Sequence, residues 1–166
     1  DEGGWQIDPA IYTARCAKAI RACVAAFRHL KNAAALEMAQ RSMGFLLAHS
    51  VDDSGRFLHH TGVREGGDLV LQEDQAQVAL AMLDLVELDP DTPWLDRAWQ
   101  IAVGLKSRSW RRQGEVPMST APVAELMLRL GERQHARSLL ARKAGPRSHN
   151  AAAAYGLALL EAEREL

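Results

Sequence analysis

The strongest structural signal in the chain is the sequence LQEDQAQVAL at residues 71–80. It places Glu73, Asp74 and Gln75 just before residues 78–88, of which nine of eleven are apolar. Acidic residues suit the first turn of a helix because they interact favourably with its dipole. A helix this apolar is buried on more than one side. We therefore predict a buried helix over residues 73–88, whose polar N-terminal end is the best candidate for chemistry or binding.

Six further helices are predicted from hydrophobic periodicity and from the residues that start or end helices. The first begins at Asp8 and Pro9, with Asp8 as N-cap and Pro9 at the first helical position. A loop at residues 1–8 precedes it, and a long loop at residues 50–71, containing an extended arm, precedes the central helix. The six predicted ranges are 9–30, 33–49, 93–110, 120–131, 132–143 and 151–160.

The helices alternate in character along the chain. The first, third, fifth and seventh are apolar nearly all round, whereas the others carry one apolar stripe. In the helix at 93–110, for example, we expect Trp94, Leu95 and Trp99 to face inward, and Arg97 and Gln100 to face water. An inner and an outer layer of helices would produce this alternation. The predicted fold class is all-α, with antiparallel helical hairpins in two layers forming a partial (α/α) toroid of about seven helices; a plain helical bundle is the alternative.

Composition limits the class of protein. The chain has 166 residues, 48% apolar and 25% charged, which suits a single soluble domain over residues 1–166. A net charge of −1 gives no general attraction to nucleic acid or to acidic membranes. No run approaches the ~18 apolar residues of a membrane span. We therefore expect no nucleic-acid partner and no membrane.

Cysteine spacing and motifs exclude several kinds of site. Cys16 and Cys23 lie about 10 Å apart on one helix, too far for a disulfide. No spacing of His and Cys resembles a zinc site, and no nucleotide-binding fingerprint is present. We expect no metal and no cofactor. Because the first residue is Asp1, we expect the chain to be part of a longer protein; since nothing in it signals export, we expect a cytoplasmic location.

If the inner helices run in one direction, their N-terminal ends gather at one end of the molecule. A carboxylate there could act chemically, so we assign Asp74 as the candidate catalytic residue and Glu73 as its alternate. Helix capping and interaction with the helix dipole explain several of these residues equally well, and that alternative stays open. The candidate ligand-binding residues at this end are Trp5, Asp8, Gln75, His59, Thr120, His149 and Asn150.

Several stretches share a pattern with one family. They are Glu73–Ala76, Val78–Leu85, Trp94–Ala98, Ala35–Leu47 and Asp53–Leu58. Together they resemble the helical C-terminal region of the large thioredoxin-domain proteins of the spermatogenesis-associated type, and the resemblance covers most of residues 9–143. Those proteins pair a thioredoxin-like domain with a six-hairpin, glycosidase-like (α/α) toroid.

The chain also departs from that family. Gln72 stands where the family has Leu, and Met118–Ala121 replaces a Pro-Ser-Gly-Asn-type turn. The chain contains no redox C-x-x-C. The resemblance therefore implies a non-redox partial toroid related in fold to sugar-processing enzymes, with no assigned reaction.

Two functions follow from this reading. The first is a domain that presents a polar pocket to a small polar or carbohydrate-like ligand. The second is a scaffold that docks a partner domain, or another copy of itself, through an open apolar flank. The residues leave open whether the domain is an enzyme.

Overall fold

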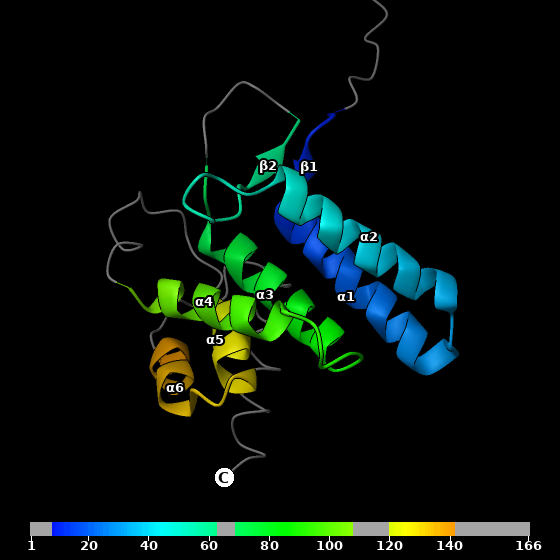
Figure 1. Cartoon of the computed structure of the whole chain (residues 1–166). Helices are drawn as coiled ribbons and strands as arrows, with labels where there is room; N and C mark the ends of the chain where they lie inside the picture. The colour runs from blue at the N-terminus through cyan, green and yellow to red at the C-terminus, as the bar shows by residue number, and fades with distance from the viewer. Residues whose placement is uncertain (1–7, 63–68, 108–119, 142–166) are drawn as a thin grey trace, which may run out of the picture.

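The computed structural model describes residues 8–62, 69–107 and 120–141. Within them the protein is all-α, with six helices and a two-stranded sheet (Figure 1). The helices are α1 (Thr13–Leu30), α2 (Ala33–His49), α3 (Gln72–Val86), α4 (Trp94–Lys106), α5 (Thr120–Arg129) and α6 (Arg133–Ala141). The strands are β1 (Ile11–Tyr12) and β2 (His60–Thr61). The helix predicted at 151–160 lies outside the described residues.

The helices form two layers. α3 packs between α1 and α5, and each of these three helices packs against the next helix in the chain: α1 with α2, α3 with α4, and α5 with α6. Asp74 at the start of α3 bonds to Ala14 at the start of α1, and Arg129 at the end of α5 bonds to Asp84 near the end of α3. The three inner helices therefore run in one direction, which is the condition on which the predicted site depends.

The inner helices are not equally buried. Every residue of α3 from Asp74 to Leu85 is buried, because α1, α4 and α5 surround it. Among the described helices, α1 packs mainly against α2 and α3, and one of its faces, including Ala19 and Ala22, is exposed. The prediction of a buried central helix is confirmed, whereas α1 is less buried than its composition indicates.

Ion pairs join the three inner helices. Arg21 of α1 donates to Asp84 of α3 at 2.9 Å and to Glu125 of α5 at 2.6 Å. Arg129 of α5 also pairs with Asp84. Burial alone would lower the pKa of Arg21, but its bonds to Glu125 and Asp84 outweigh burial and raise it. The three helices are thus tied together by partly buried charges that balance one another.

Residues 50–62, called the arm below, cross the starts of α1 and α3. Val51 forms a bridge with Phe57, and β2 pairs antiparallel with β1, with Tyr12 opposite His60. Phe57 has no exposed surface. Figure 1 shows the β1–β2 ribbon at the end where α1 begins. The predicted extended arm is therefore present, and its apolar centre is part of the core.

Two local predictions are wrong. The first helix begins at Thr13 rather than Pro9, because Asp8 Oδ1 accepts a hydrogen bond from Ala10 N and the next two residues form β1. Leu95 and Trp99 do not face the core: they are 41% and 36% exposed, whereas Ala98 and Ala102 are fully buried. The buried face of α4 consists of Ala98, Ile101, Ala102 and Leu105.

Candidate functional site

Asp74 lies at the centre of the contacts between the arm, α1 and α3. Its Oδ1 accepts a hydrogen bond from Ala14 N at 3.0 Å, and its Oδ2 lies 2.9 Å from His59 Nδ1. Tyr12, the N-cap residue of α1, makes no side-chain capping bond. Asp74 therefore satisfies a backbone N–H group that the start of α1 leaves without a partner.

Gln75, the next residue, bonds to the arm as a neighbouring strand would. Its Oε1 accepts from Phe57 N at 2.9 Å, and its Nε2 donates to Phe57 O at 2.6 Å. The arm also bonds to α1, since Thr13 N donates to His59 O at 2.9 Å. We call Thr13, Ala14, Phe57, His59, Asp74 and Gln75 the helix-start cluster.

The carboxyl group of Asp74 is an unusual acid. Burial disfavours its charged form and raises its pKa to about 6, although the hydrogen bond from His59 acts in the opposite direction. A carboxylate held against an imidazole can orient a catalytic base. Here, however, both carboxylate oxygens bond to the protein and the residue has no exposed surface. This placement favours a structural role for Asp74.

The structure places two other candidates away from Asp74. Glu73 points to α1 and pairs with Lys18 at 2.9 Å near the surface, as expected for neighbours on a helix that point about 100° apart. Asp8 is exposed; its bond from Ala10 N and its bond from the Tyr12 hydroxyl lower its pKa.

Thr120 is the first residue of α5. Trp5, His149 and Asn150 lie outside the described residues. Of the predicted site, the structure thus brings together Asp74, Gln75 and His59.

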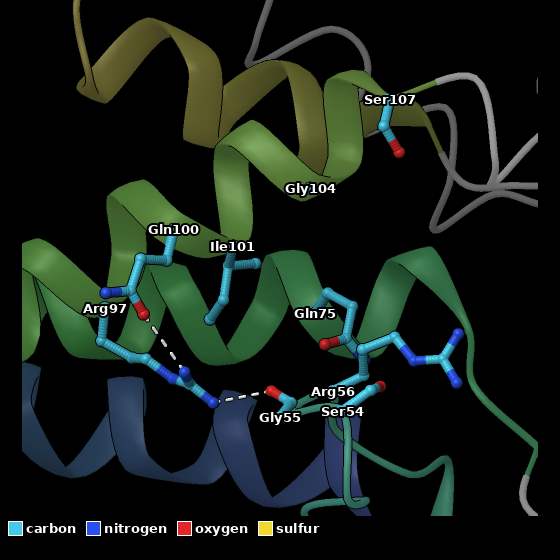
Figure 2. Close-up of a pocket in the computed structure, with 9 residues that line it drawn as sticks. All are labelled: Ser54, Gly55, Arg56, Gln75, Arg97, Gln100, Ile101, Gly104 and Ser107. Atoms are coloured by element: carbon cyan, nitrogen blue, oxygen red, sulfur yellow. Dashed lines mark hydrogen bonds between the residues drawn. The ribbon is translucent and has the colours of Figure 1, made fainter.

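A cleft of about 590 Å³ opens between the arm and α4. We call it the arm–α4 cleft. Figure 2 shows the arm on one side, α4 on the other, and Gln75 of α3 between them. Its lining residues are Ser54, Gly55, Arg56, Gln75, Arg97, Gln100, Ile101, Gly104 and Ser107. Most of these residues are polar, and Gln75 belongs to both the cleft and the helix-start cluster.

Arg97 spans the cleft at one end. Its Nη2 donates to Gly55 O at 2.6 Å and its Nη1 donates to Gln100 Oε1 at 3.2 Å (Figure 2). Gly55 has φ +81°, and a Cβ there would lie 3.3 Å from Arg97 Nη2. Glycine thus allows both the turn of the arm and the close approach of the guanidinium group.

A second cation in the cleft, Arg56, is already neutralised. Its Nη2 and Nε lie 2.9 Å and 3.0 Å from Asp52 Oδ2. Burial works against the charge on Asp52, but bonds from Ser54 and Arg56 outweigh it and lower the pKa of that carboxyl. In Figure 2 the guanidinium group of Arg56 points away from Arg97.

Sequence reasoning missed the residues of this cleft on α4. It placed Arg97 and Gln100 in water, which is correct for a helix considered alone. The spacing of Arg97, Gln100 and Gly104 places them along one side of a helix and was an available signal. Nothing in the local pattern shows that the arm lies opposite this side.

The described residues were also compared with the requirements of a metal site, a cysteine pair and a membrane span. Across residues 8–62, 69–107 and 120–141, no group of three or more His, Cys, Asp or Glu side chains could hold a metal ion. Cys16 and Cys23 are free thiols, and burial raises the pKa of Cys16. None of the described helices is both long and apolar enough to cross a membrane. Comparison of the chain with protein-family models and with curated proteins gives no match.

Proposed function

We propose that this chain is a helical binding domain whose arm–α4 cleft takes a small polar ligand of carbohydrate size. The observation that carries the proposal is the cleft itself, since about 590 Å³ lies in the ordinary range of ligand pockets. Ser54, Gln100 and Arg97 offer donors and acceptors for hydroxyl groups, and Ile101 offers an apolar surface. The side chains of Asp74 and Gln75, by contrast, are occupied by bonds within the protein.

The proposal is tested by filling the cleft. Gly104 lines the cleft and a Cβ added there would meet no atom within 4 Å, so Gly104→Phe is the variant chosen to fill it. Gly44 on α2 is a matched control, because it is also helical with nothing within 4 Å. A sugar or sugar derivative at about five times its Kd should raise the Tm of the wild type by about 3 °C. Gly104→Phe should lose this shift and Gly44→Phe should keep it; equal shifts in both variants would refute the proposal.

A scaffold remains the second candidate, and a specific surface favours it. Leu95, Trp99 and Val103 repeat every four residues along α4 and are 41%, 36% and 60% exposed. An apolar stripe of this kind is typical of a contact with another protein. Sedimentation of the wild type and of Trp99→Asp tests it: self-association abolished by the substitution would support a scaffold, and a monomer in both would count against self-docking.

We also propose that the chain belongs to the helical region of the spermatogenesis-associated thioredoxin-domain proteins and forms part of an (α/α) toroid. The parallel inner helices, each with an antiparallel outer partner, support this proposal. Its test is the gene sequence upstream of Asp1. A thioredoxin-like domain encoded there would support the assignment, and an unrelated domain would refute it.

A further inference from the structure

The charge of Arg97 has only neutral partners. Its two bonds go to a backbone carbonyl oxygen and to an amide oxygen. In the described part of the chain it forms no ion pair, whereas Arg21, Arg28, Arg56 and Arg129 each pair with a carboxylate. Arg97 is also partly buried, and an anion interacts more strongly with a partly desolvated cation than with one fully in water.

No residue that lines the cleft carries a negative charge. Two of its nine lining residues are arginines, and none is Asp or Glu. Because Asp52 neutralises Arg56, the uncompensated positive charge lies at Arg97. A guanidinium group has five N–H donors, and the two bonds described use two of them. Donors therefore remain for a carboxylate or a phosphate, the anions that best match this planar group.

We propose that the arm–α4 cleft binds the anionic group of a small hydroxylated ligand, a carboxylate or a phosphate, with Arg97 contacting the anion. The inference rests on the proposed function and specifies its ligand class. Gln100 and Ser54 are placed to bond the hydroxyl groups of the ligand. Open space beside Gly104 accommodates the body of the ligand.

The test is calorimetric titration at low salt with four probes: glucuronate, glucose 6-phosphate, glucose and inorganic phosphate. Glucuronate or glucose 6-phosphate should bind the wild type at least about tenfold more tightly than glucose, because a hydrogen bond to a charged group contributes roughly a ten- to hundredfold factor. Inorganic phosphate should bind more weakly than glucose 6-phosphate. Equal affinity for those two probes would overturn the proposal, since the hydroxylated part would then contribute nothing.

Two variants assign the effect to Arg97. Arg97→Gln removes the charge and should weaken binding of the anionic probe about tenfold or more. Gln100→Glu places a carboxylate where an amide oxygen already accepts from Arg97, so it should neutralise the guanidinium group and weaken binding similarly, even if Arg97→Gln does not fold. Arg41→Gln, an exposed arginine of α2, should change nothing.

The outcomes separate this inference from the proposed function. If glucose binds as tightly as glucuronate, and neither Arg97→Gln nor Gln100→Glu alters the affinity, the anion proposal is overturned while the cleft remains a ligand site. If no probe binds the wild type, the proposed function fails and the anion proposal fails with it.

Discussion

The helix-start cluster and the arm–α4 cleft share Gln75, yet they use polar groups in opposite ways. In the cluster, both carboxylate oxygens of Asp74 and both polar atoms of Gln75 bond to the protein. In the cleft, Arg97 is partly buried and bonds only to neutral oxygens. Polar groups that are fully bonded internally hold a fold together, whereas an unbalanced charge beside a cavity is available to a ligand. Substitutions in the cluster should therefore change stability, and substitutions in the cleft should change binding.

The largest effect should come from Asp74→Ala. The change leaves the buried N–H group of Ala14 without its acceptor and the partly exposed ring of His59 without its partner. An unsatisfied buried donor together with a small cavity should lower the free energy of unfolding by about 3 kcal/mol, measured by urea denaturation. The control is Glu73→Ala, which removes an exposed ion pair and should cost under about 0.5 kcal/mol. Equal costs for the two would show that the cluster does not hold the arm.

The next effect concerns pH. Because burial raises the pKa of Asp74 to about 6, the folded protein holds this proton more tightly than the unfolded chain does. This tighter binding of the proton stabilises the folded state fully below about pH 4, the ordinary pKa of an aspartic acid in the unfolded chain. The stabilisation, of up to about 3 kcal/mol, is lost as the pH rises through about 6. Asp74→Asn cannot titrate. The free energy of unfolding of the wild type should therefore fall relative to that of Asp74→Asn between about pH 4 and pH 7; parallel curves would contradict this assignment.

Gln75→Leu should have a somewhat smaller effect. It leaves the N–H and C=O groups of Phe57 buried and unbonded, which should cost about 2 kcal/mol in urea denaturation. The matched control is Gln77→Leu on the same helix. Gln77 is also buried, and its Oε1 has no hydrogen-bond partner within the described structure, so Leu there should be neutral or stabilising. If both variants lost the same stability, loss of the two Phe57 bonds would not explain the result.

Gly55→Ala tests whether the arm positions Arg97 in the cleft. Alanine at φ +81° should cost about 1 kcal/mol, and its Cβ would press on Arg97 Nη2. Gly131→Ala has a similar φ of +79° with nothing within 4 Å, so it carries the backbone cost alone. Both should lower stability similarly, but only Gly55→Ala should weaken glucuronate binding. Weakened binding in Gly131→Ala would mean that general destabilisation, rather than a displaced Arg97, is responsible.

The smallest change in stability should follow Gln100→Glu. The new carboxylate keeps the acceptor for Arg97 Nη1 at the edge of the cleft. The free energy of unfolding should stay within about 0.5 kcal/mol of the wild type, because a solvent-accessible ion pair contributes little. If Gln100→Glu lowered the free energy of unfolding as much as Asp74→Ala does, the cleft would contribute to stability as the helix-start cluster does. The proposed difference between the two regions would then be wrong.

Sequence reasoning predicted the parts that depend on local pattern. The apolar run after Asp74 gave a buried helix, and the alternation of helix types gave the two layers. The start of α1 was misplaced because Asp8 and Pro9 match a helix start locally, whereas pairing of β1 with β2 depends on residues 48 or more positions away. Trp99 was placed in the core because its type is apolar, but the buried face of α4 consists of Ala98, Ile101, Ala102 and Leu105.

The residues predicted to form the site show the same division. Asp74 and Gln75 were recognised as important from their position, and the structure shows why: they bond to Ala14, Phe57 and His59. Their partners are distant in sequence, so the pattern alone could not distinguish a structural role from a catalytic one. The cleft was missed because it forms only where the arm folds against α4, a contact that no periodicity encodes.

The contrast between the two regions is tested most directly by mapping where a ligand binds. Backbone amide chemical shifts should be measured while glucuronate is added to the wild-type protein. We expect the amides of Gly55, Gln100 and Gly104 to shift with a common affinity, while those of Ala14 and Lys18 stay unchanged. Shifts concentrated at Ala14, His59 and Asp74, with Gly104 unaffected, would contradict this account and return the site to the helix starts.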